Sequence, residues 1–369
     1  MPVKVLIIDD SAMVRTLLTK ILNQHPDITV VGSAPDPLVA KERIKLLKPD
    51  VLTLDVDMPR MDGIEFLEKL MRINPMPVVM VSSLTQKGAA VTLKALELGA
   101  FDFVHKPTDN LRNNLELYSD EITGKVLGAA ASRLARKPQS EPAKARVLTG
   151  SVSVTPKVHV DEVIRKTSAP NPINPQRIVA IGSSTGGIEA LKEVCTRFPK
   201  NLPAAVVITQ HIPEPFPFAM AKRMNSICEM EIQVAEDQQE LKNGNIYIAP
   251  GDRHLMINVK NGKYICHLSD ETPVNRHKPS VDVLFRSVNQ AAGRNVTGVI
   301  LTGMGEDGAL CLKEIREAGG YTIGQDEESS VVWGMPGAAW KSGAVMEKLS
   351  LLKISDAIIK HLSANTRGY

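Results

Sequence analysis

Residues 50–59, DVLTLDVDMP, contain a short apolar run that ends in two aspartates, and four similar runs lie on either side of it within the first 108 residues. These four runs are rich in β-branched residues and read VKVLIID, ITVVGSA, PVVMVSS and FDFVHKP. Between the first two, apolar residues recur at the spacing of one helix face, at Val14, Leu17, Leu18, Ile21 and Leu22. Five strands that alternate with helices predict a parallel, doubly wound α/β sheet.

Length and composition predict two folded domains. The 369 residues exceed the roughly 100–200 residues of one domain. The hydrophobic share of 43% and the charged share of 23% are ordinary for a globular chain, which excludes wholesale disorder. Lys and Arg number 44 against 41 Asp and Glu, and this near balance argues against nucleic acid or a membrane surface as the main partner.

Cysteine usage and hydropathy indicate a cytoplasmic protein. The four cysteines are widely spaced and form no C-x-x-C pair, as is typical of a reducing compartment. The N-terminal sequence MPVKVLIIDD reaches acidic residues after a short apolar run, so we expect no signal peptide. No run of about 18 apolar residues occurs, so we expect no insertion into a membrane.

The composition changes after a last predicted helix at about 115–136. Residues 125–146 hold six basic residues against one acidic residue, and apolar periodicity is lost as far as residue 176. Prolines interrupt this stretch at positions 138, 142, 156, 170, 172 and 175. We therefore predict a first domain over 1–136, a proline-rich basic linker over 137–176 and a second domain over 177–369.

The alternation of strands and helices resumes in the second domain. RIVAIG, AAVVITQ and NVTGVILTG predict strands, and GGIEALKEVCTRF, VDVLFRSVNQAAG and CLKEIREAGG predict helices. NGNIYIAPG at 243–251 and HLMINVKNGKYICHLS at 254–269 predict antiparallel hairpins, the second with a tight turn at Asn261-Gly262. The second domain is therefore expected to be doubly wound and mostly parallel, with antiparallel hairpins.

Charged and hydroxyl side chains follow four strands of the first domain, namely Asp9 and Asp10, Asp55 and Asp57, Ser82 and Ser83, and Lys106. The carboxyl ends of parallel strands meet at one edge of a sheet, where ligands bind. Packed carboxylates favour a hard cation such as Mg²⁺, and an aspartate beside a metal and a lysine can accept a phosphoryl group. A single strand-end acid would more simply cap a helix, but four acids with a lysine would not.

IIDDSAMVR, TLDVDMPRMDG, VMVSS and HKP resemble the response-regulator receiver domain, from residue 1 to 108 and up to about 136. The resemblance implies a flavodoxin-like fold with Asp55 as the phospho-acceptor. It also implies a Mg²⁺ site made by Asp10, Asp55 and the backbone carbonyl of Asp57, with Asp9 behind it. The residues that respond to the phosphoryl group would be a hydroxyl, an aromatic ring and a lysine: Ser82, Phe103 and Lys106.

A glycine-rich turn, GSSTGG at 182–187, joins a predicted strand to a predicted helix in the second domain. Such a turn could cradle a phosphate, or it could present a nucleophilic hydroxyl beside the positive end of a helix. The next strand ends at His211, and the strand GVILTG leads to Asp307. Serine, histidine and aspartate at three strand ends form the set needed for a nucleophile, a base and an orienting group.

GSSTGG, TQHIP, IYIAPGD, PVNRHKPSVD and LTGMGEDGA resemble the catalytic domain of the chemotaxis protein-glutamate methylesterases, a family in which this domain follows a receiver. The resemblance implies a triad with two supporting residues: nucleophile Ser184, general base His211, orienting carboxylate Asp307, the Met304 amide in the oxyanion hole, and Thr185 beside His211. The residue before the nucleophile, often Ala or Gly in the family, is Ser183 here.

This resemblance implies a phosphorylation-activated hydrolase that acts in bacterial chemotaxis. It would demethylate glutamate methyl esters of methyl-accepting chemoreceptors and deamidate receptor glutamines. A sensor histidine kinase would be the phosphodonor, Mg²⁺ would bind the receiver only, and the esterase site would need no cofactor. A receiver with a DNA-binding output is one alternative, but the sequence shows no C-terminal helix-turn-helix. A receiver with a nucleotide-binding module is another, but it leaves His211 and Asp307 without a role.

Overall fold

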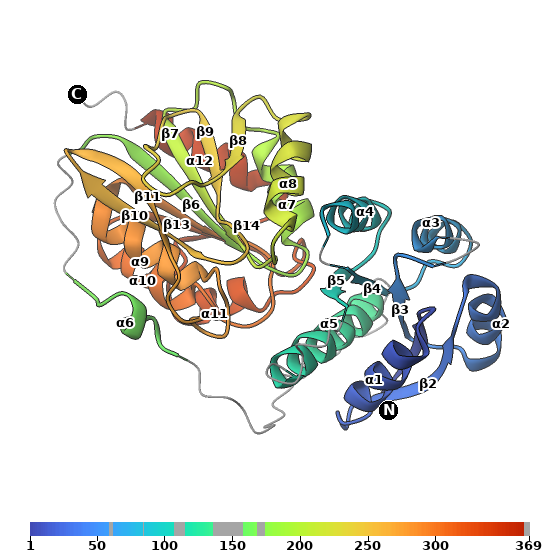
Figure 1. Ribbon diagram of the computed structural model, residues 1–369. Coiled ribbons are helices and arrows are strands. Elements are labelled where there is room, and N and C mark those ends of the chain that lie inside the picture. The colour runs from blue at the N-terminus through green and yellow to red at the C-terminus, as the bar shows by residue number, and fades with distance from the viewer. Residues whose placement is uncertain (59–61, 84, 107–114, 136–157, 168–173, 365–369) are drawn as a thin grey trace. The chain divides into compact units, whose positions relative to one another are not determined.

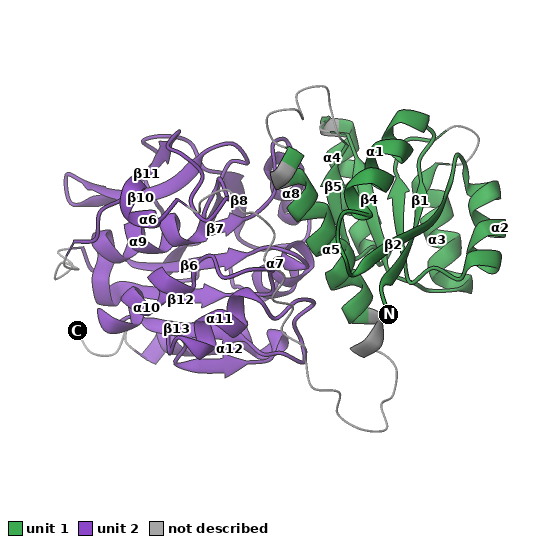
Figure 2. Cartoon of the chain, turned by 90° about the horizontal axis from the view of Figure 1, so that it is seen from below, with its two compact units in different colours: residues 1–156 green, residues 157–369 purple. Residues whose placement is uncertain are grey.

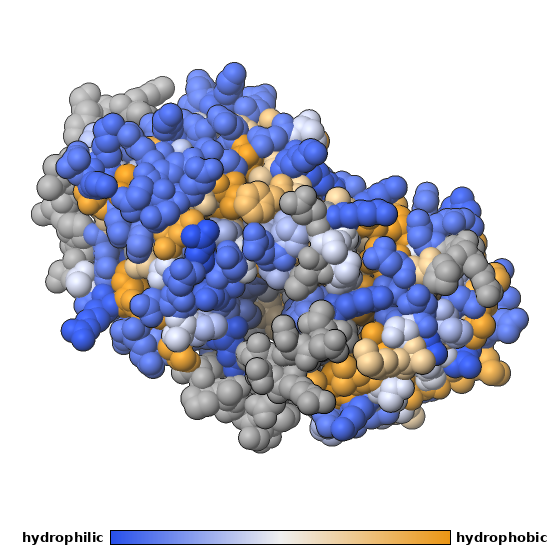
Figure 3. All heavy atoms as spheres, in the orientation of Figure 1, coloured by the Kyte–Doolittle hydropathy of each residue, from blue (hydrophilic) through white to orange (hydrophobic). Residues whose placement is uncertain are grey.

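The computed structural model describes all residues except 59–61, 84, 107–114, 136–157, 168–173 and 365–369 (Figure 1). The chain divides into two compact units, Met1–Pro156 and Lys157–Tyr369, which Figure 2 draws in green and purple. The face drawn in Figure 3 is mostly hydrophilic, with apolar residues in groups between the polar ones. Among the described helices, none combines the length and the apolar character that crossing a membrane requires.

The first unit contains a five-stranded parallel sheet, as the sequence predicts, and the structure gives the strand order β2-β1-β3-β4-β5. Its strands are β1 (Val3–Ile8), β2 (Ile28–Ala34), β3 (Val51–Asp55), β4 (Val78–Ser82) and β5 (Asp102–His105). Its helices are α1 (Ala12–Leu22), α2 (Pro37–Leu47), α3 (Gly63–Ile73), α4 (Gln86–Glu97) and α5 (Leu115–Ala135). The prediction of a last helix at about 115–136 is thus confirmed.

Local signals explain where these helices begin. The side chains of Ser11, Asp36, Asp62 and Thr85 accept hydrogen bonds from backbone amides in the first turns of α1, α2, α3 and α4. These residue types are preferred at this position because their oxygen satisfies an amide that lacks a partner within the helix. The helices that come after β1 and β3 in the chain, α1 and α3, therefore both begin at a capping side chain.

The second unit contains a seven-stranded parallel sheet in the order β14-β13-β12-β6-β7-β9-β8. Its strands are β6 (Arg177–Ser183), β7 (Ala204–Gln210), β8 (Glu231–Val234), β9 (Asn245–Ile248), β12 (Val296–Ile300), β13 (Tyr321–Gln325) and β14 (Glu347–Leu349). Its longer helices are α7 (Gly187–Cys195), α8 (Phe216–Asn225), α9 (Val281–Ala292), α10 (Ala309–Glu317), α11 (Met335–Lys341) and α12 (Leu351–Ala364).

One of the two predicted hairpins is present and the other is not. β10 (His254–Lys260) and β11 (Lys263–Ser269) pair antiparallel around Asn261-Gly262, both of which have positive φ. The hairpin predicted at 243–251 is wrong, because β9 lies inside the parallel sheet between β7 and β8. β8 reads EIQV, and so weak an apolar signal does not predict the strand that pairs with β9 on the side away from β7.

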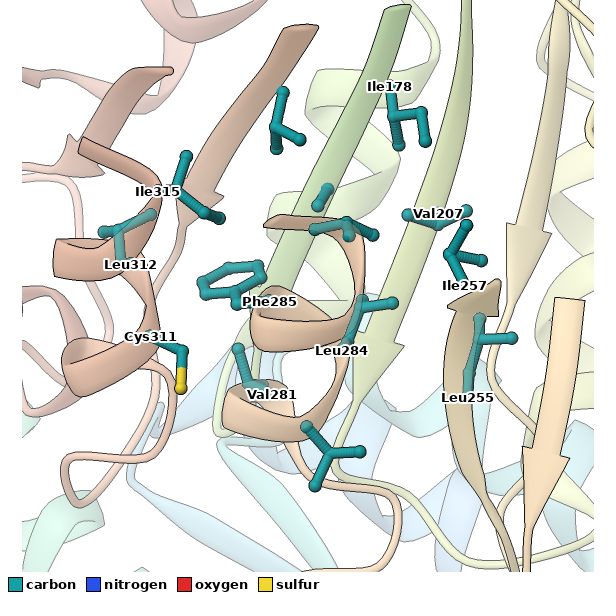
Figure 4. Close-up of a cluster of buried hydrophobic side chains, with 14 of the residues drawn as sticks. Ile178, Val207, Leu255, Ile257, Val281, Leu284, Phe285, Cys311, Leu312 and Ile315 are labelled. Atoms are coloured by element: carbon teal, nitrogen blue, oxygen red, sulfur yellow. The ribbon is translucent and has the colours of Figure 1, made fainter. Parts of the chain in front are cut away.

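Helix α9 forms the centre of the larger core. Val281, Leu284 and Phe285 on this helix are fully buried. Figure 4 shows them among side chains of β6, β7, the hairpin and α10. A helix packed on so many sides has little freedom to shift, because protein interiors are close-packed. The amino end of α9 is therefore held firmly, and that end borders the candidate site.

Part of the predicted linker packs on the second unit. Residues 158–167 include the short helix α6 (Val160–Val163), and the Val160 side chain is 1% exposed within the core of this unit. Arg286 on α9 donates to the carbonyl of Ile164 at 3.0 Å. Ordered contacts with the second unit thus begin before the predicted boundary at 177, whereas residues 137–157 and 168–173 lie outside the described residues.

We predict that Glu314→Leu destabilises the second unit by about 3–5 kcal/mol, because it leaves a buried charge with too little compensation. Arg286 is 2% exposed and forms a two-point ion pair with Glu314, at 3.1 and 2.7 Å. Its other acidic partner, Asp161, is half-exposed. Both tryptophans, Trp333 and Trp340, lie in the second unit, so urea unfolding followed by tryptophan fluorescence measures the effect.

The matched control is Glu317→Leu, the same change at an exposed position of the same helix. It should alter the free energy of unfolding by no more than about 0.5 kcal/mol. Equal effects of the two substitutions would show that the Arg286 pair contributes nothing beyond the loss of a surface charge.

Candidate active site

Three carboxylates meet at the carboxyl edge of the first unit's sheet. Asp9 and Asp55 are fully buried and Asp10 is exposed, and one oxygen from each lies within 4.8 Å of the others. Asp9 follows β1 and Asp55 ends β3, the neighbouring strand. The predicted acidic cluster is therefore assembled in space from residues that lie 45 or 46 positions apart in the sequence.

The cluster is short of positive charge. Lys106 places Nζ 2.7 Å from Oδ2 of Asp55 and 3.8 Å from Oδ2 of Asp9. Burial raises the pKa of Asp55 to about 6, although Lys106 and the amide of Asp57 act in the opposite direction. Oδ2 of Asp9 is buried without a hydrogen-bond partner among the described residues. An orphaned carboxylate oxygen with two further acids within reach suits a hard divalent cation.

Two predicted switch residues, on the neighbouring strands β4 and β5, have buried side chains. Ser82 is 1% exposed, and its hydroxyl accepts a hydrogen bond from Thr92 Oγ1 of α4 at 2.7 Å. Phe103 is 3% exposed, and Lys125 Nζ lies 5.2 Å from its ring centroid. Both side chains are thus engaged with the helices around β4 and β5 in this conformation.

In the second unit, the turn between β6 and α7 holds Ser184 rigidly. The Ser184 amide donates to the Thr302 carbonyl at 3.0 Å, and the Ser184 carbonyl accepts from Gln210 Nε2 at 2.9 Å. Ser184 is partly exposed, whereas Ser183 is fully buried and donates its hydroxyl to Gln210 Oε1 at 2.6 Å. The two adjacent serines therefore differ in exposure, and Ser184 alone offers its hydroxyl to a ligand.

A glycine lets a second loop approach this turn closely. A Cβ atom added to Gly303 would lie 2.8 Å from Cβ of Ser184 and 2.4 Å from Sδ of Met335, which is too close for either contact. Met304 follows directly and is partly exposed. Thr185 is buried, and its carbonyl accepts a hydrogen bond from Thr302 Oγ1 at 3.0 Å. The residues predicted to support the nucleophile therefore belong to two loops that pack on each other.

His211 follows β7, the strand next to β6. Its amide donates to the Ser183 carbonyl at 3.2 Å, which sets the histidine beside the nucleophile turn. The imidazole Nε2 lies 2.9 Å from Oδ2 of Asp307, and the ring of His277 stacks on it with centroids 3.8 Å apart. Nδ1 is buried with no hydrogen-bond partner among the described residues, so it is the nitrogen left to take a proton.

Asp307 is 2% exposed and sits in a cage of donors. Besides His211, four groups donate to it: Val281 N at 2.7 Å, Asn275 Nδ2 at 2.9 Å, Ser280 Oγ at 2.9 Å and Asp282 N at 3.3 Å. Burial alone would raise the pKa of this carboxyl, but the hydrogen bond and charge of His211 hold it well below its ordinary range. An ionised carboxylate only accepts, so the Nε2 of His211 carries the hydrogen.

Four residues of this site were missed by the sequence analysis: Asn275, His277, Ser280 and Asp282. All lie in the stretch PVNRHKPSVD, which contributed to the family resemblance but received no roles. Ser280 caps α9, since its hydroxyl accepts from Val283 N at 3.5 Å. A serine before an apolar helix is a recognisable cap, and the positive end of a helix attracts a carboxylate. A serine cap followed by an apolar helix could therefore have predicted that the amino end of α9 lies near a carboxylate.

Asp282 is a second buried carboxyl beside Asp307. It is 2% exposed, and its two oxygens accept hydrogen bonds from Cys311 N at 2.9 Å and Asn275 Nδ2 at 2.8 Å. Burial raises its pKa to about 7, and the negative charge of Asp307 adds to the shift. The pKa values of these two neighbouring carboxyls are thus shifted in opposite directions, upward for Asp282 and downward for Asp307.

Comparisons with known proteins show what the two units are similar to. The family model described as CheB methylesterase matches residues 179–358, and the response regulator receiver domain matches residues 5–116. The chain is 50% identical to a protein-glutamate methylesterase/protein-glutamine glutaminase of Hydrogenovibrio crunogenus, over 97% of this chain and 98% of that protein. It is 48% identical to the protein of the same name in Paraburkholderia xenovorans, over 98% and 97%.

One solved structure corresponds to the second unit. The CheB methylesterase catalytic domain of Thermotoga maritima is 38% identical, with a TM-score of 0.50, and the match covers 50% of this chain and 98% of that domain. The match therefore extends over nearly the whole of that domain and half of this chain.

We predict that the stability advantage of the wild type over Asp282→Asn falls as the pH rises from about 4 to 7. A carboxyl whose pKa is raised by folding keeps its proton while the unfolded chain loses it. The folded state then binds more protons, so stability decreases with pH, by up to about 1.4 kcal/mol per pH unit. Urea unfolding of both proteins at several pH values measures this, and parallel curves would contradict the assignment.

Proposed function

The chain belongs to the CheB methylesterase family with an N-terminal receiver domain, and from this premise we propose that Ser184, His211 and Asp307 carry out its hydrolysis. The reaction is hydrolysis of protein glutamate methyl esters, together with deamidation of protein glutamines. The observation that carries the assignment is the 2.9 Å contact of His211 Nε2 with buried Asp307, beside a turn that exposes Ser184.

In the proposed reaction, Ser184 Oγ attacks the ester carbonyl carbon while His211 Nδ1 takes the hydroxyl proton. Asp307 stabilises the imidazolium that forms and keeps the ring in its tautomer. The oxyanion of the tetrahedral intermediate accepts a hydrogen bond from the Met304 amide, near the positive end of α7. The C–O bond to methoxide then breaks, and His211 returns the proton, so that methanol leaves and an acyl-serine remains.

Water completes the cycle at the same residues. His211 removes a proton from water as the water attacks the acyl carbon, and Ser184 leaves with that proton as the free hydroxyl. The product is the glutamate carboxylate. When the substrate is a glutamine, the first leaving group is ammonia instead of methanol, and the second half of the reaction is unchanged. Thr185 supports His211 in this scheme.

The receiver would control this activity through a phosphoryl group on Asp55. Asp10, Asp55 and the backbone carbonyl of Asp57 would hold a Mg²⁺ ion, with Asp9 behind them. Bound Mg²⁺ supplies charge neutralisation for the transferred phosphoryl group. Lys106, already 2.7 Å from Asp55, would pair with that group as the charge on Asp55 changes. Ser82 and Phe103 would then leave their present contacts, which alters the receiver surface.

The partners follow from the two activities. The substrates would be methylated glutamates and glutamines of methyl-accepting chemoreceptors, and the phosphodonor would be the sensor histidine kinase of the same pathway. We also propose a cytoplasmic location, which the four widely spaced cysteines favour.

We predict that Ser184→Ala lowers the turnover of methylated receptors by about 10⁵-fold or more, because it removes the nucleophile. Release of methanol from membranes that contain methylated receptors measures the turnover. The control is Ser183→Ala, one residue away. It leaves Gln210 Oε1 without its 2.6 Å donor and should cost about 1–3 kcal/mol of stability while retaining turnover. An inactive Ser183→Ala with an active Ser184→Ala would reverse the assignment.

We predict that Asp55→Asn abolishes activation by an acyl phosphate, because an amide cannot accept the phosphoryl group. In the wild type, the acyl phosphate with Mg²⁺ should raise methanol release by at least about 5-fold, the lower range of allosteric coupling. Chelation of Mg²⁺ should prevent the increase. Asp57→Asn is the matched control, because only the backbone of Asp57 is proposed to bind the metal. Activation of Asp55→Asn, or its loss in Asp57→Asn alone, would contradict these roles.

A further inference from the structure

Asn275 joins the end of the linker to the catalytic carboxylate. Its backbone amide donates to the carbonyl of Val158 at 3.1 Å, and its side-chain Nδ2 donates to Oδ1 of Asp307 at 2.9 Å. Val158 lies within the stretch that the sequence predicts as linker. Asn275 thus connects the predicted linker, through two hydrogen bonds, to the carboxylate that contacts His211.

The Asn275 amide also separates two buried acids. Nδ2 donates to Oδ2 of Asp282 at 2.8 Å as well as to Asp307, so both of its hydrogens are used. Adjacent carboxyls in a low-dielectric interior repel each other unless a donor or a proton lies between them. The amide therefore fixes the distance and the plane of the Asp307 carboxylate, which in turn aligns the Nε2–H of His211.

The backbone around Asn275 is shaped for this contact. Asn275 and the next residue, Arg276, have φ values of 51° and 72°, in the left-handed region. Asparagine tolerates this region better than most residues. Val274 and His277 exchange backbone hydrogen bonds of 3.1 and 2.8 Å across the turn, which closes it. In this conformation the turn presents the Asn275 amide to the two buried carboxyls.

The linker end is itself fixed to the core of the second unit. Two residues after Val158, the side chain of Val160 is 1% exposed among core residues. Ile164 accepts from Arg286 of α9 at 3.0 Å, and the first amides of α9, at Val281 and Asp282, donate to Asp307. Residues 158–164 are therefore fixed to the same core as α9, and Asn275 is the residue that connects them directly to Asp307.

We propose that Asn275 is a positioning residue for the His211–Asp307 pair, and that residues 158–164 hold it in place. The inference rests on the proposed function, because it takes Asp307 as the group that orients the base. Among its described contacts, Asn275 touches the carboxyls and the linker end, so it acts through Asp307 and not on the substrate. Its loss should lower kcat and leave KM nearly unchanged, since its described side-chain contacts are with the two carboxyls.

The test uses Asn275→Gly in the full-length protein, because glycine accepts the left-handed backbone while removing the amide. We expect kcat for methanol release to fall about 10- to 100-fold, the cost of a small misplacement in an active site. KM should stay within about 2-fold. The matched control is Asn261→Gly, an asparagine with φ 53° in the surface turn of the β10–β11 hairpin, which should keep wild-type kinetics.

A double-mutant cycle tests the role of the linker end. Val160→Ser loosens residues 158–164 from the core and should lower kcat in the same direction as Asn275→Gly. If the linker end acts through Asn275, the double variant should be no slower than Asn275→Gly alone. The losses of kcat from two substitutions do not add when both act through the same residue. Tryptophan fluorescence checks that each variant is folded. Should Asn275→Gly fail to fold, Asn275→Ser, which cannot bridge both acids, takes its place with the same expected loss.

Wild-type kcat in Asn275→Gly would overturn the positioning role, and so would a loss carried by KM alone. Independent, multiplicative losses in the double variant would overturn the role of the linker end. Wild type and Ser184→Ala are assayed in parallel to separate this inference from the proposed function. An active wild type with an inactive Ser184→Ala and an unaffected Asn275→Gly overturns the inference alone. An active Ser184→Ala overturns the proposed function and the inference with it.

Discussion

The buried charge of Asp307 is the constraint on which the second unit's site depends. A carboxylate taken out of water is costly unless donors surround it, and here the donors come from His211, the 275–282 segment and the amino end of α9. The support extends further, because buried His254 on β10 accepts from the Ser280 amide at 3.1 Å. Burial lowers the pKa of His254, which favours the neutral ring that this hydrogen bond requires.

The acidic cluster of the first unit also buries carboxylates, but with fewer donors around them. Asp307 has enough donors of its own, and its pKa is lowered. Asp55 has Lys106 and one amide but lies beside Asp9 and Asp10, and burial raises its pKa to about 6. In the second unit, the donors around Asp307 come from the protein itself. The acidic cluster, by contrast, has more negative than positive charge, and such a site is suited to bind a cation.

The sequence predicts which residues meet at the ends of parallel strands. It does not predict contacts that depend on residues far away in the chain. Parallel strands deliver their last residues to one edge, so Asp9 and Asp55, and equally Ser184 and His211, could be grouped from the chain alone. β9 was misplaced because its partner β8 carries a weak pattern. Asn275 was missed because its contacts depend on a left-handed turn and on the packing of residue 158, which no local spacing reveals.

The arrangement around His211 determines which of its nitrogens is free for proton transfer. Nε2 is committed to Asp307, so a rotated ring would give up a charge-assisted hydrogen bond and leave the carboxylate short of one donor. The stacked ring of His277, inclined by only 11°, covers one face and restricts tilting. The remaining nitrogen, Nδ1, lies buried and unpartnered among the described residues, beside the turn that carries Ser184. Because Nε2 is held by Asp307, Nδ1 is the nitrogen that can take a proton. The hydrogen bonds that hold the ring continue from Asp307 through Asn275 to the end of the linker.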